Sequence, residues 1–504
     1  MKKTIIRVLI VLVLIAIANK GLRFWIKSNF NARINSNLER AYNITYSELD
    51  LDVLFNGITL NKVNIEPINH KKGTIIRGHV DYASLNGLVL KDLLFNKRLN
   101  IDEITFKQPK FEVTLSADTI QKTSGKGLQS MFGDILSRAN INNFRIENGS
   151  IVLIDPISKA VKGQIKKLNI VASEIETDSL KFKYLIPFEM RDLEVTLDSI
   201  SFELNAYTHF GLGRFQYKLR DKEILLNDIS LGYSTDWVDV SRRLGVQKDI
   251  IELNVKEIGI HQFEPSNNFY TQLDIVAQKI SVDELNIKLQ RNKNIPKPPD
   301  TTKSSFDGII NSIPTKILID SLQISNSSLM YRELGVKKRE SGSINLQNIN
   351  GTITGITNMS EQQNNIGEID ANIKASLLGK AGINIALNIP YDRPEVFSLD
   401  LDVGEMEMKN LNTTLKPLIG MEIVSGQMKQ IQYHMNAGRN QSSNRLVFDY
   451  DNLHLKLINE NNKGKKNTYY RPLLTVPFEE IIYLIKKNTL LPNINLKETN
   501  IAHL

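Results

Sequence analysis

The sequence predicts a mainly β protein: an elongated, antiparallel and twisted β-groove built from duplicated units, with a few short amphipathic helices and an N-terminal membrane helix. Three observations support this fold class. Apolar and polar residues alternate with the period of two that half-buried strands require. One segment of the chain occurs twice, and the N-terminus carries a basic start followed by an apolar run.

The internal duplication is the most informative feature of the chain. Residues 128–155 align without a gap with residues 306–333, at a constant offset of 178. Recurrence at a fixed spacing is typical of architectures in which each unit buries its apolar side by stacking on its neighbours. The first part of each copy places apolar residues at i, i+3, i+4 and i+7, which predicts short amphipathic helices near 128–136 and 306–313.

The second part of each copy predicts a β-hairpin. Asn148-Gly149 is a strong signal for a two-residue type I′ turn, and Asn326-Ser327 occupies the same place in the second copy. Because side chains alternate between the two faces of a strand, pairing across this turn brings four apolar residues of each copy onto one face. These residues are Phe144, Ile146, Ile151 and Leu153 in the first copy, and Leu322, Ile324, Leu329 and Tyr331 in the second.

The remaining segments also favour half-buried antiparallel strands, because continuous apolar runs suited to a parallel sheet are missing. Residues 291–305 are poor in apolar side chains and contain three prolines, which indicates a linker or exposed loop. The predicted organisation is an anchor helix over 1–28, a first β-groove unit over 29–290, a linker over 291–305, a second unit over 306–470 and a C-terminal helix and tail over 471–504.

The N-terminus predicts entry into a secretion route. Four residues containing two lysines precede the run from Ile5 to Ala18, which is apolar except for Arg7. The A-x-A sequence at 16–18 would suit a cleaved signal peptide, but apolar residues continue to Ile26. We favour an uncleaved signal anchor, with a helix long enough to approach the hydrocarbon thickness of a bilayer. The candidate anchor residues are Ile5, Leu9, Leu12, Ile15 and Trp25.

Composition excludes several classes of chemistry. The absence of cysteine from all 504 residues excludes thiol catalysis, Cys-ligated zinc and disulfides, and fits an extracytoplasmic protein. Basic and acidic residues number 63 and 55 and are interspersed, so the net charge of +8 does not indicate a nucleic-acid partner. Seven scattered histidines have no metal-ligand spacing, although His434 and His454 could meet on adjacent strands. Catalytic and nucleotide-binding motifs are missing, and we expect no enzyme, no cofactor and no metal site.

A repetitive sheet with one apolar face must cover that face, and the sequence offers only short helices to do so. Roughly 20 to 30 strands spaced by about 4.8 Å would form a ladder on the order of 100 to 140 Å long. An uncovered apolar concavity along such a ladder would bind acyl chains, since each buried CH₂ contributes about 0.8 kcal/mol. The alternative is a closed two-sheet core in a non-catalytic envelope scaffold that acts through contacts with other envelope proteins. Apolar patterning alone does not separate these alternatives.

Several motifs resemble the AsmA-like family of Gram-negative envelope proteins. An apolar N-terminal helix runs into ITYSELDLDVLFNGITLNKVNI, and a recurring I-x-x-[LF]-x-I-x-N-[GS]-x-[ILV] element begins at Ile141 and again at Ile319. The stretch LNTTLKPLIGMEIVSGQMKQIQYHMNAG near the C-terminus is similar to that family as well. The terminal segment PFEEIIYLIKKN, which predicts a helix, departs from the family pattern.

The resemblance implies a function as well as a fold. Members of this family are related to bridge-like lipid-transfer proteins and carry a twisted β-groove with an apolar interior. A single-pass anchor holds them in the inner membrane, and the bulk of the chain lies in the periplasm. The implied partners are phospholipid and the inner membrane, and the implied role is phospholipid transport that supports outer-membrane homeostasis. The eight apolar residues of the two predicted hairpins are then the candidate lipid-binding residues.

Overall fold

The structure is a computed structural model, and it shows a mainly β protein whose strands belong largely to one antiparallel-rich sheet with few short helices. The described residues are 16–17, 19–21, 23–25, 27–32, 35, 42–52, 56–68, 75–88, 99–114, 139–176, 190–264, 274–299, 306–336, 338, 340–393, 395–438, 441–457, 459–460 and 466–467. The chain divides into two compact units. The first contains residues 1–204, 211–225 and 265–273, and the second contains residues 205–210, 226–264 and 274–504.

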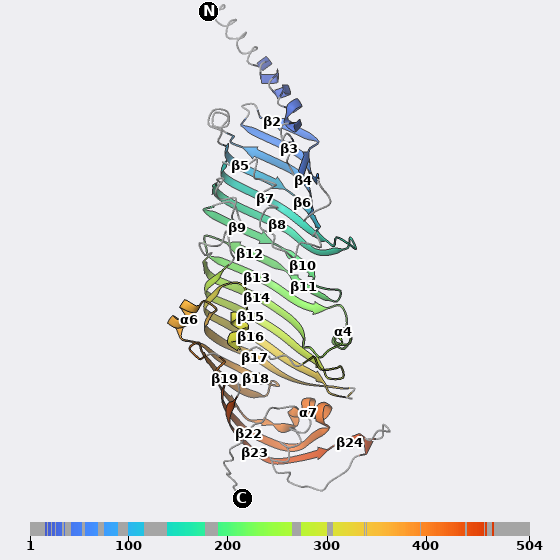
Figure 1. Cartoon of the computed structure of the whole chain (residues 1–504), viewed down its shortest axis with the longest axis vertical. Coiled ribbons are helices and arrows are strands. Elements are labelled where there is room, and N and C mark those ends of the chain that lie inside the picture. The colour runs from blue at the N-terminus through green and yellow to red at the C-terminus, as the bar shows by residue number, and fades with distance from the viewer. Residues whose placement is uncertain are drawn as a thin grey trace, which may run out of the picture. The chain divides into compact units, whose positions relative to one another are not determined.

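The first unit is a ladder in which most strands follow one another in chain order (Figure 1). Its strands are β1 (Tyr42–Thr45), β2 (Glu48–Leu51), β3 (Gly57–Pro67), β4 (Ile75–Asn86), β5 (Leu99–Lys107), β6 (Lys110–Thr114), β7 (Ala139–Ile154), β8 (Val161–Glu176), β9 (Asp192–Leu197), β10 (Ser199–Glu203) and β12 (Arg214–Lys218). The short strands β1 and β2 both pair with β3, and β5 and β6 both lie between β4 and β7. Strands β11 (Thr208–Leu212) and β13 (Glu223–Tyr233) contribute residues to both units.

The second unit contains most of the longer strands and several short helices (Figure 1). Its strands are β14 (Ile250–Glu264), β15 (Ile275–Asn292), β16 (Ile317–Leu334), β17 (Ser341–Thr357), β18 (Glu368–Leu377), β19 (Ala381–Pro390), β20 (Phe397–Val403), β21 (Met406–Glu407), β22 (Met421–Ala437), β23 (Ser442–Leu457), β24 (Asn459–Glu460) and β25 (Lys466–Asn467). Its helices are α4 (Trp237–Leu244), α5 (Phe306–Asn311), α6 (Ser360–Ile366), α7 (Asn412–Ile419) and the 3₁₀ turn η2 (Met408–Leu411).

The duplication seen in the sequence is also a duplication of strand pairing. In the first unit β5 and β6 pair in parallel with β7, which then pairs antiparallel with β8. In the second unit β15 pairs in parallel with β16, which then pairs antiparallel with β17. The connections into β7 and β16 cover residues 115–138 and 293–316, so each contains 24 residues. A parallel pair needs such a crossover connection, whereas antiparallel neighbours need only a short turn.

The predicted hairpins are wrong. Residues 139–154 form one continuous strand, β7, and residues 317–334 form one continuous strand, β16. Ile146 therefore pairs with Ile170 of β8, and Ile324 pairs with Gly351 of β17. Asn148 and Asn326 do adopt the positive φ angles of 55° and 51° on which the turn prediction relied. They form β-bulges instead, since one residue in the left-handed region can either reverse a chain or add a residue within a strand.

The bulges align across neighbouring strands of the first unit. Lys62, Gln108, Asn148 and Lys167 all have φ between 49° and 55°. Gln108 lies between Lys107, which pairs with Glu147, and Lys110, which pairs with Ser150, so it stands beside Asn148. The Asn148 N–H donates to Asn169 Oδ1 of β8 at 2.8 Å. Positive-φ residues therefore lie at one height of the ladder in β3, between β5 and β6, in β7 and in β8, and the register shifts there between β7 and β8 but not between β3 and β4.

The second unit repeats this alignment. Glu284 of β15, Asn326 of β16 and Asn348 of β17 have φ of 49°, 51° and 51°. The register between β16 and β17 shifts by one residue between Ile324 and Ser327 and shifts back by Leu329. The β7–β8 ladder shifts at the corresponding places, so the bulge is part of the duplicated unit.

Hydrophobic cores lie within both units. In the first unit Phe30 packs with strands β2 to β4, and its ring meets Tyr46 edge-on at 6.0 Å, while a second core gathers around Ile101, Ile141 and Ile175. One core of the second unit is built around Met406, Met408 and Met428 and is covered by α7, and another gathers around Trp237 and Val240. Thr414 of that helix donates a hydrogen bond to the Ser343 carbonyl at 2.6 Å.

The N-terminal prediction falls mostly outside the described residues. Ile5, Leu9, Leu12 and Ile15 are among the residues that the structure does not describe, and so are 128–136 and most of 458–504. Trp25 lies in the helical stretch between residues 16 and 32 and is 54% exposed. None of the helices in the described part of the chain is both long enough and apolar enough to cross a membrane. The predicted amphipathic helix near 306–313 is present as α5.

Candidate functional site

The candidate site is the apolar face of the central strands in each unit. A bulge shifts side-chain alternation by one residue, so residues on both sides of it share a face although their numbers differ by an odd step. In β7 this groups Phe144 and Ile146 with Ile151 and Leu153, and in β16 it groups Leu322 and Ile324 with Leu329 and Tyr331. The eight residues predicted from the sequence thus lie on one face of their strand in each unit. The reason is a bulge and not a turn.

Neighbouring strands extend this face in the first unit. Ile104 and Phe106 pair with Phe144 and Ile146, and Ile146 pairs on its other side with Ile170. The rings of Phe106 and Phe144 meet edge-on with centroids 5.9 Å apart. The apolar face of the first unit also contains Phe111 and Val113 of β6 and Ile165, Leu168 and Ala172 of β8. These neighbours are not among the residues predicted from the sequence, although apolar residues also alternate on both sides of Gln108 and Lys167.

The second unit has a corresponding apolar face. Val282 and Ile287 of β15 pair with Ile324 and Leu329, and Leu346 of β17 pairs with Leu329 from the other side. The apolar face of the second unit further contains Ile280, Leu285 and Leu289 of β15 and Ile344, Ile349 and Ile353 of β17. Three adjacent strands therefore place aliphatic side chains on one side.

The eight predicted residues are only partly buried. All of them retain intermediate exposure, while Arg145 and Gln323, which lie next to them in sequence on the opposite face, are exposed. The cores nearby behave differently: Ile101 is 2% exposed and Met428 is 0% exposed. These eight side chains are thus shielded more than Arg145 and Gln323 and less than an ordinary core, while Ile104 and Ala172 on the same face of the first unit belong to the buried core around Ile101.

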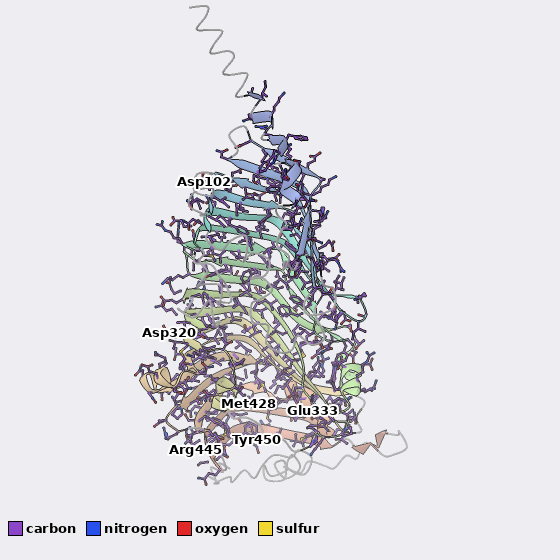
Figure 2. All side chains as sticks on the ribbon, turned by 45° about the horizontal axis from the view of Figure 1, so that its top comes forward. Asp102, Asp320, Glu333, Met428, Arg445 and Tyr450 are labelled. Atoms are coloured by element: carbon purple, nitrogen blue, oxygen red, sulfur yellow. The ribbon has the colours of Figure 1, made fainter. Side chains whose placement is uncertain are left out.

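Charged and hydroxyl side chains cluster at the C-terminal end of β16, next to its apolar face. Tyr331 donates a hydrogen bond to Glu333 Oε2 at 2.7 Å, and Lys293 Nζ lies 2.8 Å from Glu333 Oε1 (Figure 2 labels Glu333). Arg291 binds Asp249 through two bonds of 2.7 and 2.5 Å. Burial, and next the hydrogen bond to Glu333, raise the pKa of the Tyr331 phenol above its usual range. The hydroxyl therefore remains a neutral donor at neutral pH.

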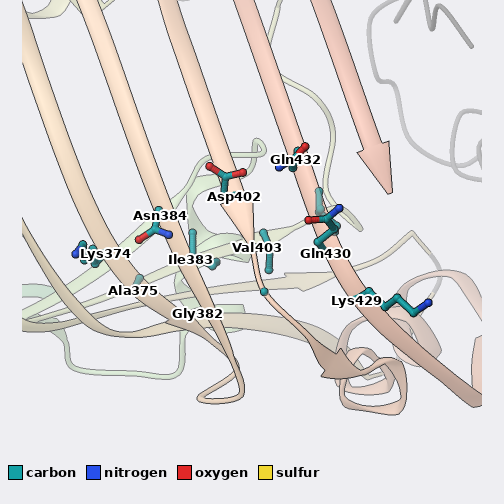
Figure 3. Close-up of a pocket in the computed structure, with 12 residues that line it drawn as sticks. Lys374, Ala375, Gly382, Ile383, Asn384, Asp402, Val403, Lys429, Gln430 and Gln432 are labelled. Atoms are coloured by element: carbon teal, nitrogen blue, oxygen red, sulfur yellow. The ribbon is translucent and has the colours of Figure 1, made fainter. Parts of the chain in front are cut away.

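The opposite face of the last strands contains a polar depression. Lys374, Asn384, Asp402 and Gln432 stand side by side on β18, β19, β20 and β22 (Figure 3). The depression measures about 530 Å³. Gly382 and Gly404 lie next to this row, and a Cβ added at Gly382 would meet nothing within 4 Å. The two glycines contribute no side chains to this space, and its lining combines the polar row with the aliphatic residues Ile383, Val403 and Ile431.

Other candidate chemistry was not brought together. His434 pairs across strands with Arg445 and binds Asp400 at 2.6 Å, whereas His454 contacts Ser425 at 2.6 Å, so the two histidines do not meet. No group of three or more possible metal ligands occurs among the residues that the structure describes. In comparisons with known proteins, no family model and no curated protein matches this chain.

Proposed function

We propose that the protein binds phospholipid acyl chains on the apolar faces of its two units and helps to move phospholipid in the cell envelope. The observation that carries this proposal is partial exposure. Strand pairing and aligned bulges keep the apolar side chains of β5 to β8, and of β15 to β17, on one face, yet the eight predicted residues are not fully buried. Apolar area left in contact with water is the physical property that acyl-chain binding uses.

The cellular setting is part of the same proposal. A basic N-terminus and an apolar run suit a signal anchor in the inner membrane, and the absence of cysteine suits a periplasmic chain. The resemblance to AsmA-like proteins supports the same placement and a role in outer-membrane homeostasis. In this proposal the protein is not an enzyme, because it binds and moves the lipid without changing any covalent bond of the lipid.

Photo-crosslinking in cells tests whether lipid contacts the apolar faces. A benzophenone amino acid replaces Phe144 or Leu322 in the full chain, and Arg145 or Gln323 provides the matched control on the opposite face of the same strand. After growth in radioactive phosphate and irradiation, we expect phospholipid adducts at the first two positions and at least about fivefold less at the controls. Equal labelling of both faces, or none at all, would favour the scaffold alternative.

A second experiment separates lipid passage from folding. Ile146 and Ile170 are direct partners on β7 and β8, so Ile146→Glu with Ile170→Lys places opposite charges side by side. The two charges satisfy each other in part, but an acyl chain crossing them would lose apolar contact and would have to desolvate them. The variant should accumulate, fractionate with membranes and unfold normally, yet fail to restore envelope integrity in a deletion strain. Full complementation by the folded variant would contradict passage along this face.

A further inference from the structure

The last strand of the second unit has the features of a pairing edge. Strand β23 (Ser442–Leu457) is 16 residues long, and among the described strands its backbone pairs only with β22. The edge strands β1 and β2 of the first unit contain only four residues each. Natural sheets protect an edge with short strands, proline, lysine or bulges, because a long regular edge is a template for another chain.

The sequence of β23 lacks most of that protection. It contains no proline and no glycine, and its one lysine, Lys456, lies next to the C-terminal end of the strand. The positive-φ residue Asn452 also lies beyond the middle of the strand. From Ser442 to Asp449 the pairing with β22 proceeds without a register shift. The eight residues from Ser442 to Asp449 are therefore regularly extended, and among the described strands only β22 pairs with them.

The central part of β23 is complementary to itself when paired antiparallel about Val447. In that register Arg445 stands opposite Asp449, and by symmetry the pair occurs twice. Arg445, Val447 and Asp449 share one face, and Arg445 and Asp449 are exposed. Leu446 stands opposite Phe448, and both lie on the face that carries the Tyr450 ring, 4.9 Å from the Phe448 ring (Figure 2 labels Arg445 and Tyr450).

The neighbouring symmetric registers fit less well. Moving the axis to Phe448 would set Arg445 against Asp451, whose carboxylate already lies 2.8 Å from Lys429 Nζ, and would set Asp449 against Val447. Moving it to Leu446 would set Arg445 against Val447 and leave Asp449 opposite Ser443. Opposite charges directly across two strands stabilise a pair, and a charge facing an aliphatic side chain does not.

We propose that β23 is the dimerisation edge of this protein and that its partner is a second copy of the same chain. The two strands pair antiparallel about a two-fold axis at Val447, which is the isologous arrangement expected of a dimer. Residues that face each other in such a pair point to the same side of the sheet, so the α7-covered side of one copy continues into that of the other. This inference does not depend on whether the apolar faces bind lipid.

The absence of native cysteine makes the test direct. Opposed residues on antiparallel strands have Cα atoms about 4.5 to 5.5 Å apart, which suits a disulfide. The full chain carrying Val447→Cys, purified in detergent and treated with a mild oxidant, should form a reducible dimer. Val171→Cys in β8 is the matched control, because Val171 is 41% exposed and lies in an interior strand. A dimer in both variants, or in neither, would overturn the proposal.

Charge exchange tests the register and the identity of the partner. In the Val447→Cys background, Arg445→Asp and Asp449→Arg each create two like-charge pairs, so each should lower the crosslinking yield roughly tenfold. The combined exchange restores two opposite-charge pairs and should return the yield to within about twofold. Failure of the combined variant to recover would overturn the register about Val447. A crosslink to another protein, or within one chain to a second cysteine placed in residues 458–504, would show a different occupant of the edge.

Discussion

Replacing Asn326 with valine should unfold the second unit at lower denaturant concentration, because this residue forms the bulge in β16. Its φ is 51°, a value that β-branched side chains strongly disfavour. Its side-chain amide also donates to Asp283 Oδ1 at 2.8 Å, and its N–H donates to Asn350 Oδ1 at 3.1 Å. Valine retains the backbone N–H but lacks the side-chain amide, and its branched Cβ makes the positive φ sterically unfavourable.

The expected magnitude has two parts. The left-handed conformation costs a β-branched residue about 1 to 3 kcal/mol, and the exposed hydrogen bond from the Asn326 side-chain amide to Asp283 contributes about 0.5 to 1 kcal/mol. Asn326→Val should therefore destabilise the unit by about 1.5 to 4 kcal/mol. Asn326→Gly loses the same amide but accepts the positive φ, so its cost should be near 1 kcal/mol. Asn372→Val changes an exposed residue of β18 that is not among the positive-φ positions, and it should change stability by less than about 0.5 kcal/mol.

The two tryptophans provide the assay. Trp237 is 7% exposed and packs in a cluster that contains Leu334 at the end of β16, whereas Trp25 is removed by Trp25→Phe. Urea unfolding of the full chain in detergent, followed by Trp237 fluorescence, then reports on the second unit. If valine and glycine at 326 destabilise equally, or if Asn372→Val costs as much as Asn326→Val, the bulge does not require the left-handed conformation and the reasoning fails.

Two further predictions concern the same unit. Hydrogen bonds from Asn326 and then Ser325 hold the pKa of Asp283 below its usual value, so the ionised carboxylate stabilises the fold above about pH 4 and this contribution is lost as the pH falls. The difference in unfolding free energy between the wild type and Asn326→Gly should therefore narrow below about pH 4 in urea titrations. A difference that stays constant with pH would show that the Asn326–Asp283 hydrogen bond does not cause it. A Cβ at Gly342 would lie 2.5 Å from Leu418 Cγ of α7, whereas one at Gly382 would meet nothing within 4 Å. Gly342→Ala should lower unfolding stability by about 1 to 3 kcal/mol and Gly382→Ala by less than about 0.5 kcal/mol, and equal effects would refute close packing of α7 on β17.

Short-range patterns in the sequence predicted much of the fold. Alternation gave the strands, and the amphipathic stripe near 306–313 gave α5, because both depend on side-chain periodicity within a few residues. The duplication at an offset of 178 corresponds to β7 and β16 together with their parallel and antiparallel neighbours. The sequence also predicted that Phe144 and Leu153 share one face, and that Leu322 and Tyr331 do so in the second copy.

Tertiary structure alone decided between a turn and a bulge at Asn148 and Asn326. Both features use the same positive φ, so the local sequence predicts the backbone angle without predicting the direction in which the chain continues. Continuation as a strand depends on partners far along the chain: β5, β6 and β8 for β7, and β15 and β17 for β16. Those partners supply a hydrogen-bonded site on both sides, and with both sides of the strand paired the extended chain is favoured over a hairpin. The same long-range pairing determined which aliphatic side chains became buried core and which remained partly exposed.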